Sequence, residues 1–279
     1  MPVFAFQEIN KLNQRCFMEY ITSRNNDYII FCNSLHNKKN RDREGLFIFE
    51  GVKLFEEALK RSVPLVSVIF TEKEKHLEEL VPEGVRKICV SDGVYEKISS
   101  EKSPSGIFCV AKAIDKFHKI ATIYNNINGS KIILNSLRDP GNLGTVIRTA
   151  LAFGIDEIIL SDDCADIYNE KTVRASMGCL FSQKITICSD IIGTINTLKG
   201  AGYRVYATAL NEKSLSLEEI VCDRKTVFVI GNEGHGLPED IINAATSSLI
   251  IPMPGGAESL NASVASTVLI WEMYKGRNN

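Results

Sequence analysis

The C-terminal half of this 279-residue chain alternates regularly between short apolar runs and longer segments with helical spacing of apolar residues. Each apolar run has the length of a strand, and each intervening segment is long enough for one helix. Strands separated by helices form a mostly parallel sheet with helices on both faces, so we expect a doubly wound α/β domain. The expected strands are 132–134, 157–160, 184–187, 204–209, 226–230 and 249–251, and the first helix of this domain is expected at 143–153.

A second, smaller α/β module precedes this domain. The apolar runs 46–49 and 66–70 indicate strands, and the segment 52–61 between them has the spacing of an amphipathic helix. The segment 115–130 is the best linker candidate, because its Asn, Gly and Ser residues favour turns. We therefore expect domains at 1–119 and 131–279, joined by a linker at 120–130.

Several classes of protein are excluded by composition. No apolar run approaches the roughly 20 residues of a membrane helix, and the first residues lack the pattern of a signal peptide. We therefore expect a cytoplasmic protein without a membrane span. The eight cysteines include no C-x-x-C pair, and the four histidines show no i, i+4 spacing, so we expect buried thiols and no metal site.

Positive charge leans towards the N-terminal part of the chain. Residues 1–119 hold 19 basic and 17 acidic residues, whereas residues 120–279 hold 13 and 17. A basic run at 38–43 is either a solvated turn, the simpler interpretation, or a set of donors that grips phosphates. The candidate phosphate-contacting residues are Arg24, Asn25, Lys38, Lys39, Arg41 and Arg43.

Glycines and small polar residues follow three of the expected strands, in the segments 139–148, 230–238 and 251–263. Loops at the carboxyl ends of strands are where open α/β sheets bind ligands, because their backbone groups point into the crevice there. Three such loops in one domain predict a shared pocket.

These segments carry polar side chains that either support the local fold or contact a ligand. Asn142 lies at a helix start, which attracts anions. Arg148 has apolar neighbours and needs a partner, either in a structural salt bridge or in a ligand. Glu233 stands among glycines that either form a simple turn or admit a ligand. Ser259 and Asn261 precede the last helix as caps or ligand contacts.

No serine-protease triad, Walker loop or zinc pattern is present. The glycines of 231–236 lack the spacing of the dinucleotide fingerprint, which disfavours an unrelated nucleotide-binding α/β protein. A pocket of backbone loops with one Arg, one Glu, Asn and Ser suits a polar cofactor and the positioning of a hydroxyl group.

The motifs D-P-G-N-x-G-x-x-x-R-T-A, I-G-N-E-G-x-G-L and I-P-M-x-G-x-x-x-S-L-N-x-S-V-A together resemble those of a known family. They are similar to the three motifs of the SpoU (TrmH) family of RNA 2′-O-ribose methyltransferases, which belong to the SPOUT class. The resemblance covers residues 132–275. The segment 21–51 is similar to the RNA-substrate-binding domain of many members, which reverses the simpler interpretation of the basic run.

The resemblance implies S-adenosylmethionine as cofactor, held in a deep trefoil knot, and a homodimer that acts on RNA. We expect neither a bound metal nor a membrane as a partner. A guanidinium keeps its proton in proteins, so we expect the catalytic arginine to stabilise charge rather than to act as a base. The catalytic residues implied are Arg148, Asn142, Glu233, Ser259 and Asn261, and the cofactor-binding residues are Gly231, Ile251, Met253 and Leu260.

The additional N-terminal domain favours ribosomal RNA as the substrate, with transfer RNA as the alternative. A SPOUT enzyme that methylates a base nitrogen is a further alternative. A non-catalytic RNA-binding module is an alternative of another class. The argument against it is the presence of Arg148, Glu233, Ser259 and Asn261.

Overall fold

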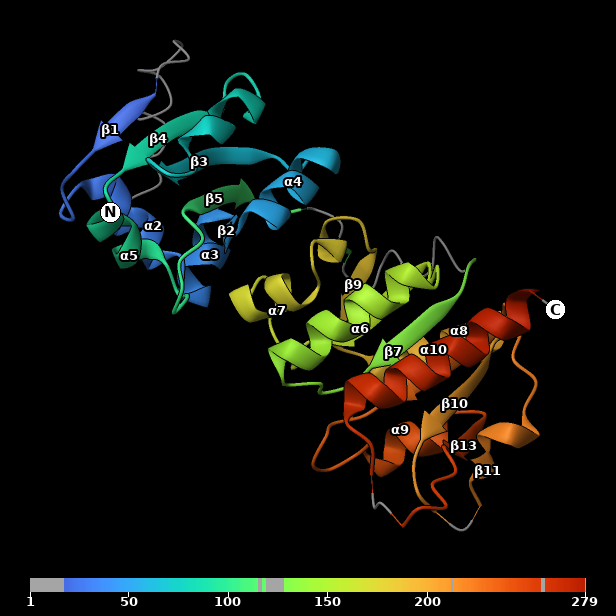
Figure 1. Ribbon diagram of the computed structural model, residues 1–279. Helices are drawn as coiled ribbons and strands as arrows, with labels where there is room; N and C mark the ends of the chain where they lie inside the picture. Colours follow the sequence, from blue (N-terminus) through green and yellow to red (C-terminus); the bar gives the residue numbers. More distant parts are fainter. Residues whose placement is uncertain (1–17, 115–116, 119–127, 212, 257–258, 279) are drawn as a thin grey trace. The chain divides into compact units, whose positions relative to one another are not determined.

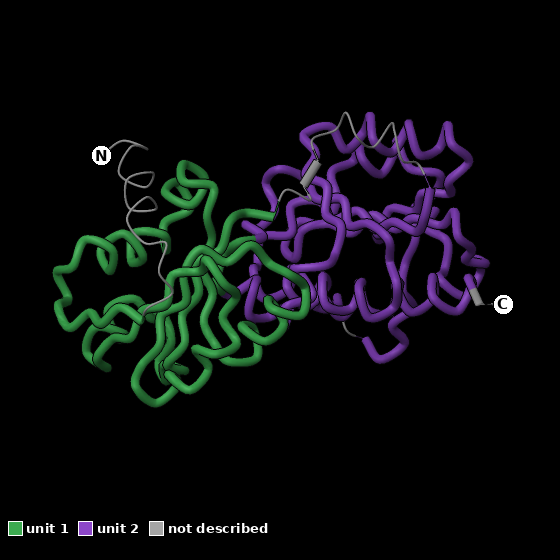
Figure 2. Tube along the Cα trace, turned by 90° about the horizontal axis from the view of Figure 1, so that it is seen from above, with its two compact units in different colours: residues 1–114, 168–170 green, residues 115–167, 171–279 purple. Residues whose placement is uncertain are grey.

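The computed structural model describes residues 18–114, 117–118, 128–211, 213–256 and 259–278. Most of the expected linker at 120–130 lies outside these residues. The chain divides into two compact units (Figure 2), the first comprising 1–114 and 168–170 and the second 115–167 and 171–279. The domain boundaries expected from the sequence remain predictions.

The first unit contains a five-stranded mixed sheet with the order β1-β4-β3-β5-β2. Strand β5 runs antiparallel to both β3 and β2, whereas β1, β4 and β3 are parallel. The strands are β1 (Glu19–Ile21), β2 (Leu46–Glu50), β3 (Leu65–Thr71), β4 (Arg86–Val90) and β5 (Ile107–Lys112). The helices are α2 (Asp27–Ser34), α3 (Lys38–Glu44), α4 (Val52–Lys60), α5 (Asp92–Ile98) and the 3-10 helix η1 (Lys75–Leu80).

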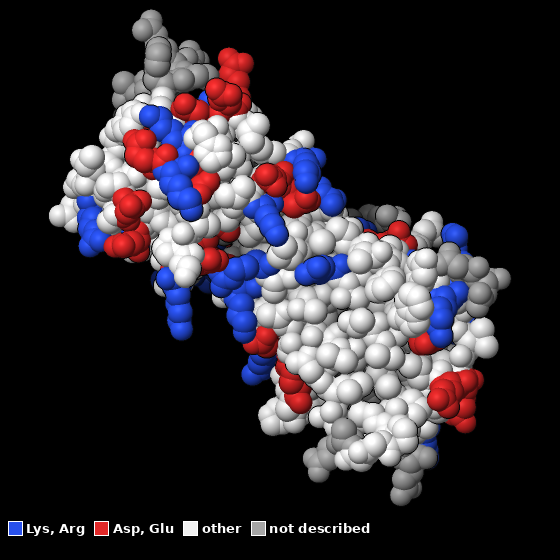
Figure 3. Space-filling view, viewed as in Figure 1, with Lys and Arg blue, Asp and Glu red and all other residues white. Residues whose placement is uncertain are grey.

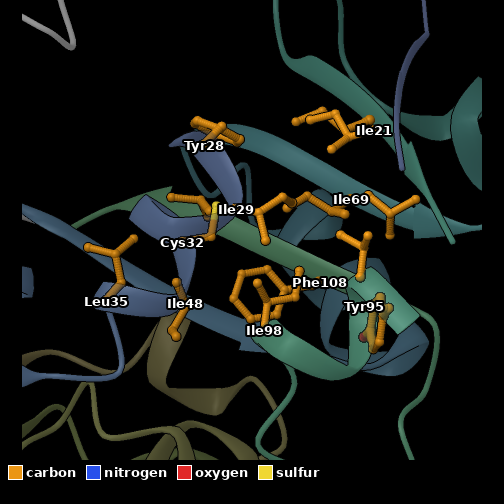
Figure 4. Close-up of a cluster of buried hydrophobic side chains, with 14 of the residues drawn as sticks. Ile21, Tyr28, Ile29, Cys32, Leu35, Ile48, Ile69, Tyr95, Ile98 and Phe108 are labelled. Carbon is orange, nitrogen blue, oxygen red and sulfur yellow. The ribbon is translucent and has the colours of Figure 1, made fainter. Parts of the chain in front are cut away.

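One hydrophobic core of this unit lies between the sheet and helices α2 and α5 (Figure 4). Ile29 of α2, Ile69 of β3 and Phe108 of β5 are fully buried in it. The buried hydroxyl of Tyr28 donates a hydrogen bond to Ser67 Oγ over 2.7 Å. This bond replaces the one that the hydroxyl would make to water.

The basic run at 38–43 forms helix α3 rather than the loop expected from the sequence. The side chain of Asn37 caps the helix by accepting a hydrogen bond from the Lys39 amide. Gly45 ends the helix in the left-handed conformation, with φ of 64°. The run has no apolar residue, so no periodicity marks it as helical.

The second unit contains an eight-stranded sheet with the order β11-β13-β10-β12-β7-β8-β9-β6. Every pair of neighbouring strands is parallel, which confirms the expected α/β fold. The strands are β6 (Phe117–His118), β7 (Lys131–Leu134), β8 (Glu157–Ser161), β9 (Ile185–Cys188), β10 (Arg204–Thr208), β11 (Leu215–Ser216), β12 (Thr226–Ile230) and β13 (Ser247–Ile250).

Helices cover this sheet. Ile195 and Leu198 of α8 and Ile241 of α9 pack in one core with Val205 and Val227 of the sheet. Helices α6 and α10 lie side by side, and α10 also packs against β12 (Figure 1). The helices are α6 (Pro140–Ala152), α7 (Glu170–Ala175), α8 (Ile191–Gly200), α9 (Glu239–Ala244) and α10 (Ala262–Asn278), with 3-10 turns η3 (Cys179–Phe181) and η4 (Leu217–Glu219).

Candidate active site

The three polar loops all lie at one edge of the second unit's sheet. They follow the carboxyl ends of β7, β12 and β13, and these strands run in the same direction. Strands β7 and β12 are neighbours, and β10 alone separates β12 from β13. Parallel strands bring their carboxyl ends to a common edge, so the fold gathers the loops as the sequence predicts.

One side chain from each loop takes part in a continuous hydrogen-bonded row. The Asn142 amide donates from Nδ2 to Glu233 Oε1 over 3.0 Å. The Asn261 amide donates from Nδ2 to Asn142 Oδ1 over 3.1 Å. These contacts orient the side chains of three expected site residues toward one another.

Asn261 also caps the last helix. Its Oδ1 atom accepts hydrogen bonds from the Ser263 amide at 2.9 Å and from Ser263 Oγ at 2.6 Å. The two roles that the sequence left open, a cap and a site contact, therefore coexist in this residue, because its amide oxygen and nitrogen serve different partners.

Asp139 is the N-cap of helix α6. The first residue of this helix is Pro140, whereas the sequence predicted Leu143. The Oδ1 atom of Asp139 accepts a hydrogen bond from the backbone amide of Asn142 at 2.8 Å, and its Oδ2 atom accepts one from Lys171 Nζ at 2.8 Å. The Lys171 ammonium and the Asn142 amide hold the pKa of this carboxyl below its usual range. Asp139 therefore stays ionised and fixes the first turn, from which the Asn142 side chain projects.

The loop after β12 is a closed turn. Asn232 and Gly236 exchange backbone hydrogen bonds of 3.0 and 2.9 Å, and Asn232 Oδ1 accepts one from the Gly234 amide at 2.9 Å. A Cβ atom on Gly231 would lie 2.4 Å from the Gly236 carbonyl, so only glycine fits there. This turn fixes the backbone that carries Glu233.

The loop after β7 contains a residue in an unusual conformation. Ser136 has φ of 56°, which is uncommon for a residue with a side chain. Its Oγ atom donates to Asp163 Oδ2 over 2.6 Å, and its carbonyl accepts a hydrogen bond from Asn232 Nδ2 at 2.9 Å. Sequence reasoning missed Ser136, Asp163 and Asn232, because only their spatial proximity shows that they join the loops after β7, β8 and β12.

Arg148 lies on α6 with an exposed side chain. Among the described residues it makes no hydrogen bond or ion pair, so the structural salt bridge considered from the sequence is not found. Ser259 is also exposed. Neither residue takes part in the row formed by Asn142, Glu233 and Asn261.

A cavity of about 410 Å³ opens beside these loops, within the size range of small-molecule sites. Two of its apolar side chains face solvent, since Leu210 is 85% exposed and Leu260 is 37% exposed. Of the four expected cofactor-binding residues, Gly231 does not line it. The lining residues are Thr208, Ala209, Leu210, Leu249, Ile250, Ile251, Pro252, Met253, Ser259, Leu260 and Ala265.

Most of the candidate RNA-contacting residues lie exposed on the first unit, where basic and acidic side chains are interspersed (Figure 3). Lys38 pairs with Asp42 and Arg43 with Glu44, while Arg24 pairs with Glu96. The exposed residues of the expected set are Arg24, Asn25, Lys38, Lys39 and Arg43.

Arg41 differs from the rest of this set. Its side chain belongs to a residue that is only 4% exposed, and its guanidinium donates to the carbonyls of Leu35 and His36 over 2.8 and 2.7 Å. The Arg41 side chain is thus turned into the protein, and its expected contact with RNA stays a prediction. The residue instead holds the turn between α2 and α3.

Within the described residues, no helix is both long enough and apolar enough to cross a bilayer. The same residues contain no group of three or more His, Cys, Asp or Glu side chains arranged to hold a metal ion.

Comparison with family models assigns both parts of the chain. Residues 129–271 match the model of the SpoU rRNA Methylase family. Residues 26–109 match the MRM3-like substrate binding domain.

Comparison with individual proteins agrees with these matches. The chain is 31% identical over 256 residues to the 23S rRNA (guanosine(2553)-2′-O)-methyltransferase RlmP of Bacillus subtilis, covering 92% of this chain and 99% of the relative. It is 25% identical to the 23S rRNA (uridine(2479)-2′-O)-methyltransferase of Streptomyces viridochromogenes, covering 92% of each chain. The AdoMet-bound rRNA methyltransferase from Sinorhizobium meliloti superposes with a TM-score of 0.81 at 28% identity, covering 94% of this chain and 98% of that one.

Proposed function

This chain belongs to the SpoU rRNA methylase family, and we propose that it transfers a methyl group from S-adenosylmethionine to a ribose 2′-hydroxyl of ribosomal RNA. The observation that carries the proposal is the row of Asn142, Glu233 and Asn261, which joins the three motif loops beside a cavity.

The cavity fits S-adenosylmethionine in chemistry. Its Leu, Ile, Met and Ala side chains suit an adenine ring and the methylene groups of a methionine chain, and the exposed Leu210 and Leu260 offer apolar surface that a ligand would cover. We infer that Ile251, Met253 and Leu260 hold the cofactor and that Gly231 shapes the adjoining turn. The AdoMet-bound relative from Sinorhizobium meliloti supports S-adenosylmethionine as the cofactor.

The bound cofactor supplies a methyl group on a positively charged sulfur. Methyl transfer forms a bond from the ribose oxygen to carbon as the carbon–sulfur bond breaks, and the hydroxyl proton passes to water. The tasks of the protein are therefore to align the hydroxyl and to stabilise the negative charge that develops on its oxygen.

We assign charge stabilisation to Arg148, whose exposed guanidinium has no partner among the described residues. A guanidinium cannot give up its proton at neutral pH, so it attracts the developing alkoxide and the neighbouring phosphate instead of acting as a base. Asn142, Glu233, Ser259 and Asn261 would position the ribose.

Ribosomal RNA is the proposed substrate, because the relatives from Bacillus subtilis and Streptomyces viridochromogenes are named as 23S rRNA methyltransferases and align over 92% of this chain. The match of residues 26–109 to a substrate-binding domain supports a role of the first unit in holding RNA. A ribosomal substrate is consistent with the cytoplasmic location expected from the sequence.

The homodimer and the trefoil knot are further parts of the proposal. The face of the second unit over α6 and α10 carries few charged side chains (Figure 3). Val264 of α10 is 49% exposed. A weakly charged helical face suits association with a second copy. The loops after β12 and β13 are where the family resemblance implies the knot.

The proposed function is tested with purified protein, ribosomal RNA and cofactor carrying a labelled methyl group. Methylation of a ribose 2′-oxygen makes one phosphodiester bond resistant to alkali, because cleavage requires a free 2′-hydroxyl. We expect label in the RNA together with one alkali-resistant linkage. Label without such a linkage would support base methylation, and no label with any ribosomal or transfer RNA would support a binding module.

A further inference from the structure

A second cavity, of about 590 Å³, lies at the opposite edge of the same sheet. Its residues precede β7, β8, β10 and β12 or end helices α6 and α10, so they gather at the amino ends of the parallel strands. The candidate active site lies at the carboxyl ends and shares no lining residue with it. The lining residues are Asn128, Gly129, Ser130, Phe153, Gly154, Asp156, Tyr203, Arg224, Lys225, Tyr274 and Arg277.

Positive charge predominates in this cavity, which has three cations and one carboxylate. Arg277 NH1 donates hydrogen bonds to Ser130 Oγ over 2.9 Å and to the Gly154 carbonyl over 2.6 Å. Both acceptors are uncharged, so these bonds leave the positive charge of the guanidinium unneutralised. Its buried Nε atom has no partner. Burial lowers the pKa of Arg277, the carboxylate of Asp156 raises it, and the positive charge of Arg224 lowers it again.

Arg224 is exposed and makes no hydrogen bond or ion pair within the described part of the chain. The single carboxylate, Asp156, accepts hydrogen bonds at Oδ2 from the amide and the hydroxyl of Ser130, at 2.7 and 2.9 Å. Asp156 is the one carboxylate among the described lining residues that offsets the three cations, and the guanidinium groups of Arg224 and Arg277 repel each other. An anion between them would relieve that repulsion.

Aromatic rings complete the cavity wall. Tyr203 is held by a hydrogen bond from its hydroxyl to the Gly129 carbonyl over 2.7 Å, and Lys225 Nζ lies 5.3 Å from the centre of its ring. Tyr274 is 39% exposed and stacks on Trp271, with ring centres 5.5 Å apart. Exposed aromatic faces beside cationic side chains are the combination that binds bases and phosphates of single-stranded nucleic acid.

We propose that this cavity binds a nucleoside monophosphate unit, with the phosphate at Arg224 and Lys225 and the base against Tyr274. Taken from an RNA strand, the unit is a nucleotide outside the catalytic centre, and this source rests on the proposed function. A free nucleotide has the same chemistry.

The single tryptophan of the chain reports on this cavity, because Trp271 contacts the rings of both Tyr274 and Phe153. We would titrate the full-length protein with uridine monophosphate, whose base differs from the adenine of the proposed cofactor, and follow tryptophan fluorescence. We expect a saturable change. Arg224→Gln should weaken binding about tenfold, the effect of losing one charge-assisted contact, while the exposed control Lys213→Gln should leave it unchanged.

A second arm replaces the nucleotide with a short oligouridylate. Tighter binding of the oligonucleotide identifies an RNA strand as the source, and tighter binding of the monophosphate identifies a free nucleotide. No saturable change, or equal affinity in Arg224→Gln and the unmodified protein, overturns the proposal. The titration needs no methyl transfer, so its outcome is independent of whether the proposed activity is found.

Discussion

Asn142 and Glu233 are joined by a side-chain hydrogen bond of 3.0 Å although 91 residues separate them in the chain. The bond ties the first turn of α6 to the loop after β12. Because Asn261 donates to the oxygen of the same Asn142 amide, this residue is the middle member of the row. Its removal should disturb all three loops.

Asn142→Ala should lower kcat by about 10²-fold, the scale of losing one positioned polar contact at a reacting centre. Cofactor affinity should stay within about twofold, since Asn142 does not line the 410 Å³ cavity. Single-turnover methyl transfer and calorimetric titration measure the two effects. Thr145→Ala, one turn later on α6 at an exposed position, is the control. Unchanged transfer in Asn142→Ala would refute the role of the row.

Gly144→Ala should destabilise the second unit by about 1–3 kcal/mol, because overpacking forces the backbone to shift. A Cβ atom at this position would lie 2.5 Å from the Thr172 carbonyl and 2.6 Å from Ala175 Cβ. Gly200, in α8, meets nothing within 4 Å and serves as the control. Gly200→Ala should raise stability slightly, because alanine favours a helix. Thermal unfolding measures the midpoint temperatures of both variants. Equal midpoints for Gly144→Ala and Gly200→Ala would contradict the close packing at Gly144.

We expect the free energy of unfolding to fall in acid because the buried carboxyl of Glu157 becomes protonated. This carboxyl is 1% exposed; burial raises its pKa, but hydrogen bonds from Lys131 and Thr186 outweigh burial and hold the pKa below the ordinary value of 4.5. A carboxyl whose pKa is lower in the folded chain stabilises the fold above its unfolded pKa, and this contribution is lost as pH falls through the folded pKa. Urea unfolding between neutral pH and about pH 3 should therefore show a falling free energy of unfolding.

Glu157→Gln is the corresponding variant. It removes the carboxylate that pairs with the buried Lys131 and should cost about 3–5 kcal/mol at neutral pH. It should also flatten the loss of stability in acid. The same acid slope in variant and unmodified protein would show that other carboxyls cause it.

Arg41 and Lys39, two residues apart on α3, should separate folding from RNA binding. Arg41→Gln should destabilise the first unit by about 1.5–3 kcal/mol, the value of hydrogen bonds from a charged group. Lys39→Gln should leave stability unchanged and weaken RNA binding with a reduced salt dependence, because Lys39 is exposed. Filter binding and thermal unfolding measure both. Weaker RNA binding by Arg41→Gln at unchanged stability would restore this residue as an RNA contact.

The sequence predicted the sheet of the second unit well, because its strands are continuous apolar runs separated by amphipathic helices. It placed the start of α6 late, since Pro140 and Gly141 suggest a turn although proline is common in the first helical turn. Helix α3 and the burial of Arg41 were missed, because a run without apolar residues carries no periodic signal.

The candidate site divides in the same way. The residues in the three motifs were named from the sequence, and the structure joins Asn142, Glu233 and Asn261. The supporting contacts of Ser136 and Asp163 link side chains 27 residues apart and depend on a backbone with positive φ. Such contacts arise from the packing of neighbouring loops, which one sequence does not reveal.

The central claim is that Arg148 stabilises the reacting oxygen without holding the cofactor. The direct measurement compares cofactor binding by calorimetry with methyl transfer to ribosomal RNA in Arg148→Ala and Arg148→Lys. We predict that both variants bind S-adenosylmethionine like the unmodified protein, and that Arg148→Ala loses methyl transfer by at least about 10²-fold while lysine restores part of it. Abolished cofactor binding in Arg148→Ala, or transfer at the normal rate, would contradict this account.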